Sequence, residues 1–144
     1  MEMRLVQCVR AIAWLPSGDR LLLVQRSKDD RHDPLLWECP GGKTEMADML
    51  AELIREIAEE TNLTITGVDA PHLKVTEKTL PSNPKHPSIF ETSFYECLIR
   101  DPSQLRLSHE HDAHAFVSLV EALQFELTNT TRIALEDILK YRRD

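Results

Sequence analysis

The sequence has few cysteines, no long apolar run and no excess of positive charge, and each of these absences argues against a class of protein. Cys8, Cys39 and Cys97 are odd in number and widely spaced, so they form neither a disulfide framework nor a CxxC metal motif. We expect them to be small buried residues in a reducing environment. No run of about 18 apolar residues is present, and the first residues lack a secretory signal pattern. The expected location is therefore cytoplasmic, with no membrane contact.

The charge and length of the chain indicate a globular domain that does not bind nucleic-acid polymers. A formal net charge of −7 argues against a general nucleic-acid binder, which would show a basic face. Small nucleotides remain compatible, because a metal ion and a few local cations can hold phosphate in an acidic protein. With 144 residues, 42% of them hydrophobic, the chain is long enough to bury its own core. We expect one domain over residues 1–144.

Apolar periodicity and turn signals predict a single α/β domain. The expected strands are 7–15, 21–26, 73–80, 88–99 and 113–117, and the expected helices are 48–62, a brief one after the capping box at Ser118, and a last one from 128 or 129 to 141. The first long helix is expected to bury Leu50, Leu53, Ile54, Ile57 and Leu63, and the last one to run through Ile133, Leu135, Ile138 and Leu139.

Three glutamates on the first long helix are the strongest chemical signal. Glu56, Glu59 and Glu60 have the i, i+3, i+4 spacing that makes residues neighbours on a helix. Three carboxylates so close together repel one another unless a cation lies between them. Oxygen ligands of this kind favour Mg²⁺ or Mn²⁺ over zinc. The helix alone leaves open the alternative of a solvated acidic face.

The segment before this helix favours the metal site. Gly41 and Gly42 form an expected turn in which the backbone can approach a ligand and aim a carbonyl at it. Lys43 follows directly and offers a charge that attracts phosphate. Arg55 can hold a carboxylate by a two-pronged hydrogen bond and so keep the pKa of Glu56 low.

Residues 41–63 resemble the Nudix box, G-x5-E-x7-R-E-U-x-E-E-x-G-U, in which U is a bulky apolar residue. Residues 55–63 match at every fixed position but one, where Asn62 replaces glycine. Asparagine is the next-best residue for a left-handed helix end. Counted forward from Gly42, the first half is one residue short and has Asp48 where the first glutamate belongs; counted back from Arg55, it has Ala47 there, so that glutamate is either replaced by Asp48 or absent. We favour Asp48, which can also cap the helix.

The resemblance extends outside the box. Residues 21–26 look like the second core strand of the family, 37–40 like the short strand before the glycines, and 108–119 like the loop that carries a glutamate and the strand after it. The fold that the resemblance implies is the Nudix-type α/β/α sandwich, with a mixed β-sheet between helices.

The resemblance also implies a chemistry. Nudix enzymes cleave a diphosphate linkage in a nucleoside diphosphate derivative, where divalent metals neutralise charge and position an attacking water. By this resemblance Glu56, Glu59 and Glu60, with the carbonyl of Gly41, bind one or more Mg²⁺ ions, with Mn²⁺ as a substitute. Arg55 would orient Glu56 without touching the substrate.

Glu110 is the next candidate, since by resemblance its loop reaches over the metals. It would act there as a general base or an extra metal ligand, and the alternative is a solvated loop glutamate. The neighbouring His109, His111 and His114 suggest zinc by their number. We do not favour zinc, because no cysteine accompanies them and zinc usually binds four nitrogen or sulfur ligands.

The substrate-binding candidates are cations and one amide. Arg26 and Lys43 are the expected phosphate ligands, and Arg10 and Arg31 are weaker options. Asn129, near the start of the last helix, can donate and accept at once, which suits the edge of a base. It is equally well explained as the N-cap of that helix.

The leading prediction is a Mg²⁺-dependent pyrophosphohydrolase that converts a nucleoside triphosphate to its monophosphate and pyrophosphate. The alternatives are a nucleotide-sugar or dinucleoside polyphosphate hydrolase and a non-catalytic nucleotide-binding module. Such a module has no need to keep Arg55 with all three glutamates, which disfavours it. Specificity is expected in the loops 27–36 and 81–88 and near Asn129. By resemblance to relatives that dimerise, a homodimer is the assembly to look for.

Overall fold

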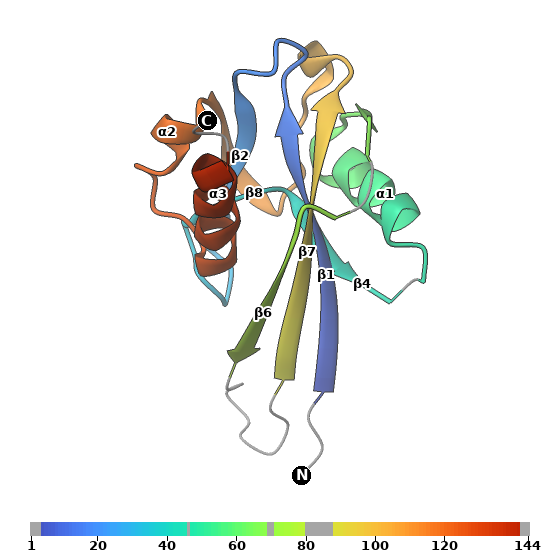
Figure 1. Ribbon diagram of the computed structural model, residues 1–144, viewed down its shortest axis with the longest axis vertical. Helices are drawn as coiled ribbons and strands as arrows, with labels where there is room; N and C mark the ends of the chain where they lie inside the picture. Colours follow the sequence, from blue (N-terminus) through green and yellow to red (C-terminus); the bar gives the residue numbers. More distant parts are fainter. Residues whose placement is uncertain (1–3, 46, 69–70, 80–87, 142–144) are drawn as a thin grey trace.

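The computed structural model describes residues 4–45, 47–68, 71–79 and 88–141 (Figure 1). The elements along the chain are β1 Arg4–Trp14, β2 Leu21–Arg26, β3 Trp37–Glu38, β4 Gly41–Thr44, α1 Met49–Thr61, β5 Ile65–Thr66, β6 Leu73–Thr79, β7 Ser88–Ile99, the 3-10 helix η1 Pro102–Gln104, β8 His111–Val117, α2 Leu119–Ala122 and α3 Asn129–Tyr141. The predicted strands at 21–26 and 88–99 match β2 and β7, whereas β5 was not predicted.

All eight strands belong to one mixed sheet. Its centre is the pair β1 and β7, which run parallel from Arg4↔Ser88 to Trp14↔Leu98. On one side β2 pairs with β8 and β3, and on the other side β5 and β6 pair antiparallel with β7. Figure 1 shows α1 on one side of the central strands and α2 and α3 on the other. The predicted mixed sheet between helices is therefore confirmed.

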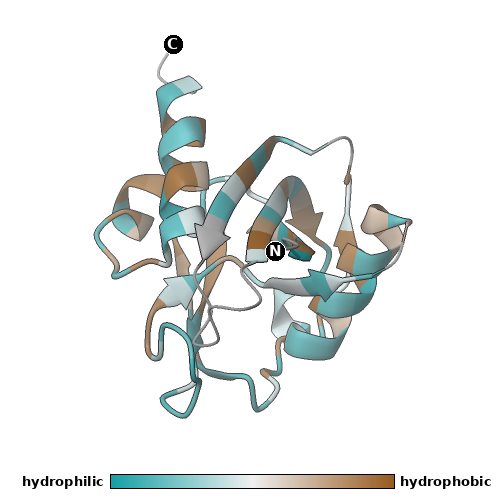
Figure 2. Ribbon diagram, turned by 90° about the horizontal axis from the view of Figure 1, so that it is seen from below, coloured by the Kyte–Doolittle hydropathy of each residue, from teal (hydrophilic) through white to brown (hydrophobic). Residues whose placement is uncertain are grey.

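The core has two parts because successive side chains of β1 point to opposite faces. Ile12 and Trp14 pack beneath α3, whereas Ala11 and Ala13 pack beneath α1. Figure 2 shows hydrophilic residues along the outer surface of α1 and hydrophobic residues on the strands beside it. Both long helices thus bury one apolar stripe against the sheet, as their periodicity predicts.

The ends of α1 have the predicted caps. The side chain of Asp48 accepts a hydrogen bond from the backbone N–H of Ala51 at 3.1 Å. Asn62 adopts the left-handed conformation with φ 61°, and its backbone N–H donates to the carbonyl of Ala58. Asparagine therefore ends the helix where the family has glycine.

Two predictions about local structure are wrong. Gly41 and Gly42 begin strand β4, which pairs antiparallel with β1, instead of forming a turn. Ile54 is 42% exposed, although it was expected to be buried. The buried stripe of α1 runs through Leu53 and Ile57 and continues onto polar side chains, so it is rotated away from Ile54.

Other predictions fall partly outside the described residues. Residue 80, the predicted end of a strand, and the proline-containing segment 81–87 lie outside the described residues, so the structure does not test the predicted loop. Cys8, Cys39 and Cys97 are buried free thiols, as expected, and burial raises the pKa of both Cys39 and Cys97 to about 12. Within the part of the chain that is described, no helix is both long and apolar enough to cross a membrane.

Candidate active site

A large cavity of about 1380 Å³ gathers most of the predicted site residues. Strands β1 and β4, the segment after β2, the loop before β8 and the start of α3 all contribute to its wall. The predicted metal and substrate residues that line it are Arg10, Arg26, Arg31, Gly41, Lys43, Glu60, Glu110 and Asn129. Elements far apart in the sequence thus meet at one concave surface, the usual form of a small-molecule site.

Glu60, in the last turn of α1, is the buried carboxylate of this cavity. The residue is 4% exposed, and its Oε2 accepts a hydrogen bond from the backbone N–H of Gly41 at 2.9 Å. Burial, together with the nearby Glu110, raises the pKa of Glu60 to about 9, while Arg10 opposes the shift. The fold therefore buries an acid whose negative charge it compensates poorly.

Glu60 belongs to a compact group of metal-ligand side chains. One ligand atom from each of Glu60, Glu110 and His111 lies within 4.8 Å of the other two. Burial also raises the pKa of Glu56 and outweighs the attraction of Arg55, so the prediction that Arg55 keeps this pKa low is wrong. Two carboxylates that repel each other, the buried Glu60 and the exposed Glu110, with a buried imidazole beside them, suit a divalent cation. The donor set therefore fits the metal that the family requires.

Arg55 lies on the exposed side of α1 and holds a row of glutamates. Its guanidinium donates to Glu56 Oε1 at 3.1 Å, to Glu59 and to Glu52. The structure thus brings Arg55 and Glu56 together as predicted. Glu59 points to Arg55 and its side chain is 59% exposed, so it does not join the buried cluster.

Glu52 is a residue that sequence reasoning missed. It is 7% exposed, and its carboxylate accepts from two nitrogens of Arg55. The i, i+3 spacing to Arg55 was the signal that could have identified it. Its burial makes it the fixed anchor of the arginine.

The two glycines are required because β4 passes so close to its neighbours. A Cβ on Gly41, whose φ is 154°, would lie 2.0 Å from the carbonyl oxygen of Val9. A Cβ on Gly42 would lie 2.9 Å from Oε2 of Glu56. Any larger residue would push β4 away from the carboxylates of α1. The role of the Gly41 carbonyl as a metal ligand stays a prediction.

Glu38 on β3 is a second buried acid that sequence reasoning missed. It is 3% exposed and contacts Arg10 at 3.3 Å, Arg26 at 3.0 Å and His111 Nε2 at 3.2 Å. Burial alone would raise the pKa of Glu38, but these three partners lower it to about 2. No local pattern indicated it, since two of the partners are 28 and 73 positions away in the sequence.

The cations at the cavity differ in their exposure and in whether they already pair with carboxylates. Arg26 pairs with Asp30 at 2.9 Å as well as with Glu38, and it donates to the carbonyl of His32. Lys43 and Arg31 are exposed at the cavity wall. Of these predicted phosphate ligands, the two exposed ones have the most freedom to meet an anion.

Asn129 is the first residue of α3, so the structure does not show it as an N-cap. Its side-chain amide donates to Oε2 of Glu77 on β6 at 2.7 Å. Both residues line the cavity. The pair therefore presents polar groups at the cavity wall, and the base-reading role of Asn129 stays a prediction.

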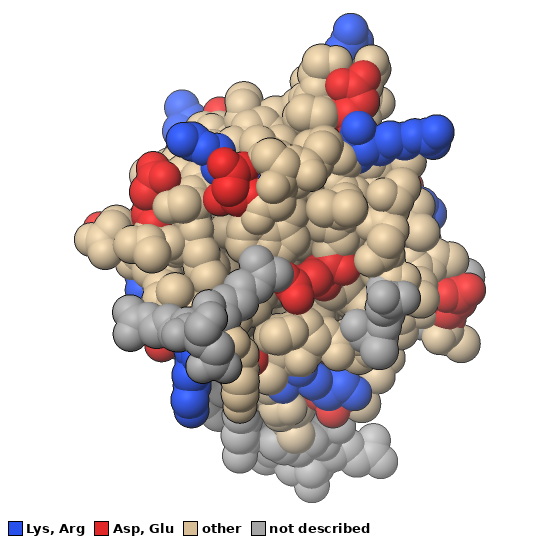
Figure 3. All heavy atoms as spheres, turned by 45° about the horizontal axis from the view of Figure 1, so that its top comes forward, with Lys and Arg blue, Asp and Glu red and all other residues tan. Residues whose placement is uncertain are grey.

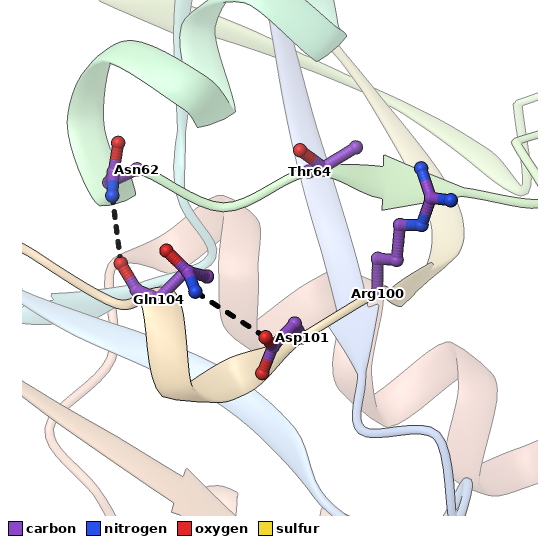
Figure 4. A pocket seen from close by; sticks show the side chains of 5 residues that line it. All are labelled: Asn62, Thr64, Arg100, Asp101 and Gln104. Carbon is purple, nitrogen blue, oxygen red and sulfur yellow. Dashed lines mark hydrogen bonds between the residues drawn. The ribbon is translucent and has the colours of Figure 1, made fainter.

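A smaller hollow of about 470 Å³ lies at the C-terminal end of α1 (Figure 4). Its side chains bind nearby groups: the amide of Asn62 donates to the carbonyl of Gln104, and the amide of Gln104 to Asp101. The carboxylate cluster lies in the larger cavity instead, so we assign the candidate site there. On the face of the described residues that Figure 3 presents, Lys and Arg side chains are scattered and form no continuous basic patch.

Comparisons with known proteins agree with this geometry. A family model described as the NUDIX domain matches residues 6–138. The MutT protein of Methanosarcina mazei Go1 has a similar structure, with a TM-score of 0.82 and 22% identity over 100% of this chain and 99% of that one. The E. coli ORF135 protein has a TM-score of 0.77 and 26% identity over 98% of this chain and 93% of that one. The NUDIX domain of Shewanella oneidensis NrtR, whose structure was determined in complex with ADP ribose, has a TM-score of 0.71 and 19% identity. This match covers 98% of this chain and 90% of that one. None of the curated proteins matches the chain.

Proposed function

Because the chain belongs to the Nudix family, whose enzymes hydrolyse nucleoside diphosphate derivatives, we propose that it cleaves a nucleoside triphosphate to the monophosphate and pyrophosphate. It is a pyrophosphohydrolase of this family, and residues 1–144 act as one domain in this proposal. The observation that carries the proposal is the buried carboxylate of Glu60 beside Glu110, at the wall of a cavity that also presents Lys43 and Arg31.

The bound metal is Mg²⁺ in this proposal, with Mn²⁺ as a substitute. Such an ion neutralises the charge of the diphosphate and polarises the bond that breaks. Glu60 and Glu110 would hold it. Glu59 and the Gly41 carbonyl stay predicted ligands, whereas Glu56, which the resemblance also makes a ligand, acts as a base in this proposal. The supporting observation is the raised pKa of Glu60, since a cation would offset the cost of burying its charge.

The other residues bind the substrate and move a proton. Glu56 accepts the proton of the attacking water, a role that suits a carboxylate with a raised pKa, and Arg55 orients it. Lys43 and Arg31 bind the phosphates, since Arg26 is already paired with carboxylates. Asn129 reads the edge of the base together with Glu77. The substrate is thus a small nucleotide, and the homodimer and the cytoplasmic location stay predictions.

A nucleoside diphosphate sugar is the second candidate substrate. The observation that favours it is the ADP ribose bound to the NUDIX domain of NrtR, whose structure resembles this chain over most of its length. ADP ribose also contains a diphosphate linkage, so the same carboxylates and cations would serve. The two candidates differ in what must fit beyond the second phosphate.

The test is hydrolysis of a nucleotide panel in Mg²⁺, with phosphate measured with and without added inorganic pyrophosphatase. A triphosphate cleaved as proposed yields phosphate only when pyrophosphatase is present. ADP ribose is followed by adding alkaline phosphatase, which releases phosphate from its monoester products. Turnover of ADP ribose alone would replace the triphosphate assignment. No turnover across the panel, with Glu60→Gln and wild type alike, would contradict the enzymatic proposal.

A further inference from the structure

The cluster at the cavity contains a nitrogen donor whose role the proposed function leaves open. His111 begins β8, and its side chain is 3% exposed. One of its ring nitrogens lies within 4.8 Å of ligand oxygens of both Glu60 and Glu110. A buried imidazole thus lies beside two carboxylates that repel each other.

The two ring nitrogens of His111 are in different situations. Nε2 lies 3.2 Å from Oε2 of Glu38, whose other oxygen pairs as a carboxylate with the guanidinium groups of Arg10 and Arg26. An ionised carboxylate only accepts, so Nε2 carries the hydrogen and donates it to Glu38. In the neutral ring Nδ1 then has a free lone pair. Among the residues that the structure describes, no group hydrogen-bonds to Nδ1, although it is buried.

This combination is the one found in metal-binding histidines. Such a histidine donates its second ring N–H to a carboxylate, which fixes the tautomer and makes the other nitrogen a better ligand. Glu38 supplies that carboxylate and is itself held in place by Arg10 and Arg26. Glu60 and Glu110 supply two oxygen ligands within 4.8 Å of a ring nitrogen of His111.

We propose that His111 Nδ1, Glu60 and Glu110 together form a binding site for a first-row divalent transition metal such as Mn²⁺. The proposal rests on the proposed function in so far as that function places a metal at Glu60, and it adds a nitrogen ligand to it. Imidazole binds transition metals better than it binds Mg²⁺, which prefers oxygen ligands and keeps several waters. With this nitrogen ligand, the site binds Mn²⁺, the substitute ion of the proposed function, more tightly than it binds Mg²⁺.

The decisive experiment observes the nitrogen directly. Metal-free protein is loaded with one equivalent of Mn²⁺, and electron spin echo modulation from a coupled ¹⁴N nucleus is recorded. The same measurement is made on protein grown with ¹⁵N-labelled histidine. A ¹⁴N modulation that changes to the ¹⁵N pattern with this label assigns the ligand to histidine. Absence of any nitrogen modulation in the wild type overturns the proposal.

Two variants assign the signal to one histidine. His111→Gln keeps an amide that can donate to Glu38 but removes the ring nitrogen, so it should lose the modulation and bind Mn²⁺ about tenfold more weakly. Its affinity for Mg²⁺ should fall less. His114→Gln, three positions along the same strand and exposed, is the matched control and should bind as the wild type does. Modulation that persists in His111→Gln overturns the assignment.

The outcomes separate this inference from the proposed function. If Mn²⁺ binds without nitrogen modulation while nucleotides are still hydrolysed, the nitrogen ligand is wrong and the hydrolase proposal stands. If the modulation is present but no nucleotide is hydrolysed, the metal site stands and the proposed reaction is wrong. The wild-type labelling experiment is decisive even if His111→Gln does not fold.

Discussion

Two buried glutamates at the same cavity have opposite electrostatic surroundings. Glu38 is 3% exposed and Glu60 is 4% exposed. The pKa of Glu38 is lowered to about 2, whereas burial raises the pKa of Glu60 to about 9. Glu38 contacts two arginines and a histidine, while Glu60 accepts a hydrogen bond from the backbone N–H of Gly41 and lies beside another acid.

The difference shows how a fold divides structural from functional charge. The protein itself neutralises Glu38, so this carboxylate stabilises the arrangement of the strands around it. Glu60 is left with an incomplete set of partners, an arrangement that costs stability unless a cation from solution completes it. A buried acid that the fold does not neutralise is therefore the better indicator of the reaction site.

The largest expected effect is the loss of stability when Glu38 is neutralised. In Glu38→Gln, Arg10 and Arg26 keep their charges but lose their buried partner, so the free energy of unfolding should fall by about 3–5 kcal/mol. Urea denaturation at pH 7 measures it. Glu136→Gln, an exposed control, should change it by at most about 0.5 kcal/mol.

The stabilising contribution of Glu38 also depends on pH. Because the pKa of Glu38 is lower in the folded protein than its ordinary 4.5, its stabilising contribution is complete above pH 4.5 and is lost as the pH falls towards 2. The stability difference between wild type and Glu38→Gln should therefore shrink over this range. A difference that stays constant from neutral pH down to pH 2 would contradict the assigned ion pairs.

The second effect is on activity. Glu60→Gln should lower kcat by about 10²–10³-fold, because the buried anion that would hold the metal is replaced by a neutral amide. The amide oxygen can still accept from Gly41, so the thermal midpoint should not fall. Steady-state kinetics and a circular dichroism melt test both parts. Undiminished turnover would contradict the metal-binding role of Glu60. A variant that unfolds would show that Glu60, like Glu38, is needed for stability.

The third effect is stabilisation by metal. A divalent cation at about 100 times its Kd should raise the free energy of unfolding of the wild type by about 2.7 kcal/mol. The gain should vanish in Glu60→Gln, because the cation completes the surroundings of this acid. Urea denaturation in Mg²⁺ or Mn²⁺, compared with denaturation in EDTA, measures this gain in the free energy of unfolding. An equal gain in both proteins would place the metal elsewhere.

The smallest expected effect concerns the anchor of Arg55. Glu52→Gln should lower kcat by about tenfold with little change in KM, because Arg55 would hold Glu56 less firmly. Glu45→Gln, exposed and just before the helix, is the matched control. A rise in KM alone would indicate that Glu52 acts on substrate binding instead.

Local sequence was a good guide to α1 and a poor guide to what surrounds it. The caps at Asp48 and Asn62 and the pairing of Arg55 with Glu56 were all predicted, because each depends on residues within a few positions. The glycine strand was mistaken for a turn, since only the close approach of β1 shows why glycine is needed. Ile54 was misplaced because apolar spacing does not show which part of a wide stripe faces the sheet.

The sequence by itself determined the family, the mixed α/β class and the carboxylates that share the helix, because these follow from ordered motifs and helical spacing. Only the tertiary structure decided that Glu60 is buried without full compensation, that Glu59 is exposed, and that His111 joins the cluster. The reason is physical: helical periodicity sets the direction of a side chain around its own axis. Its burial, its pKa and its partners depend on strands and loops that are distant in the chain.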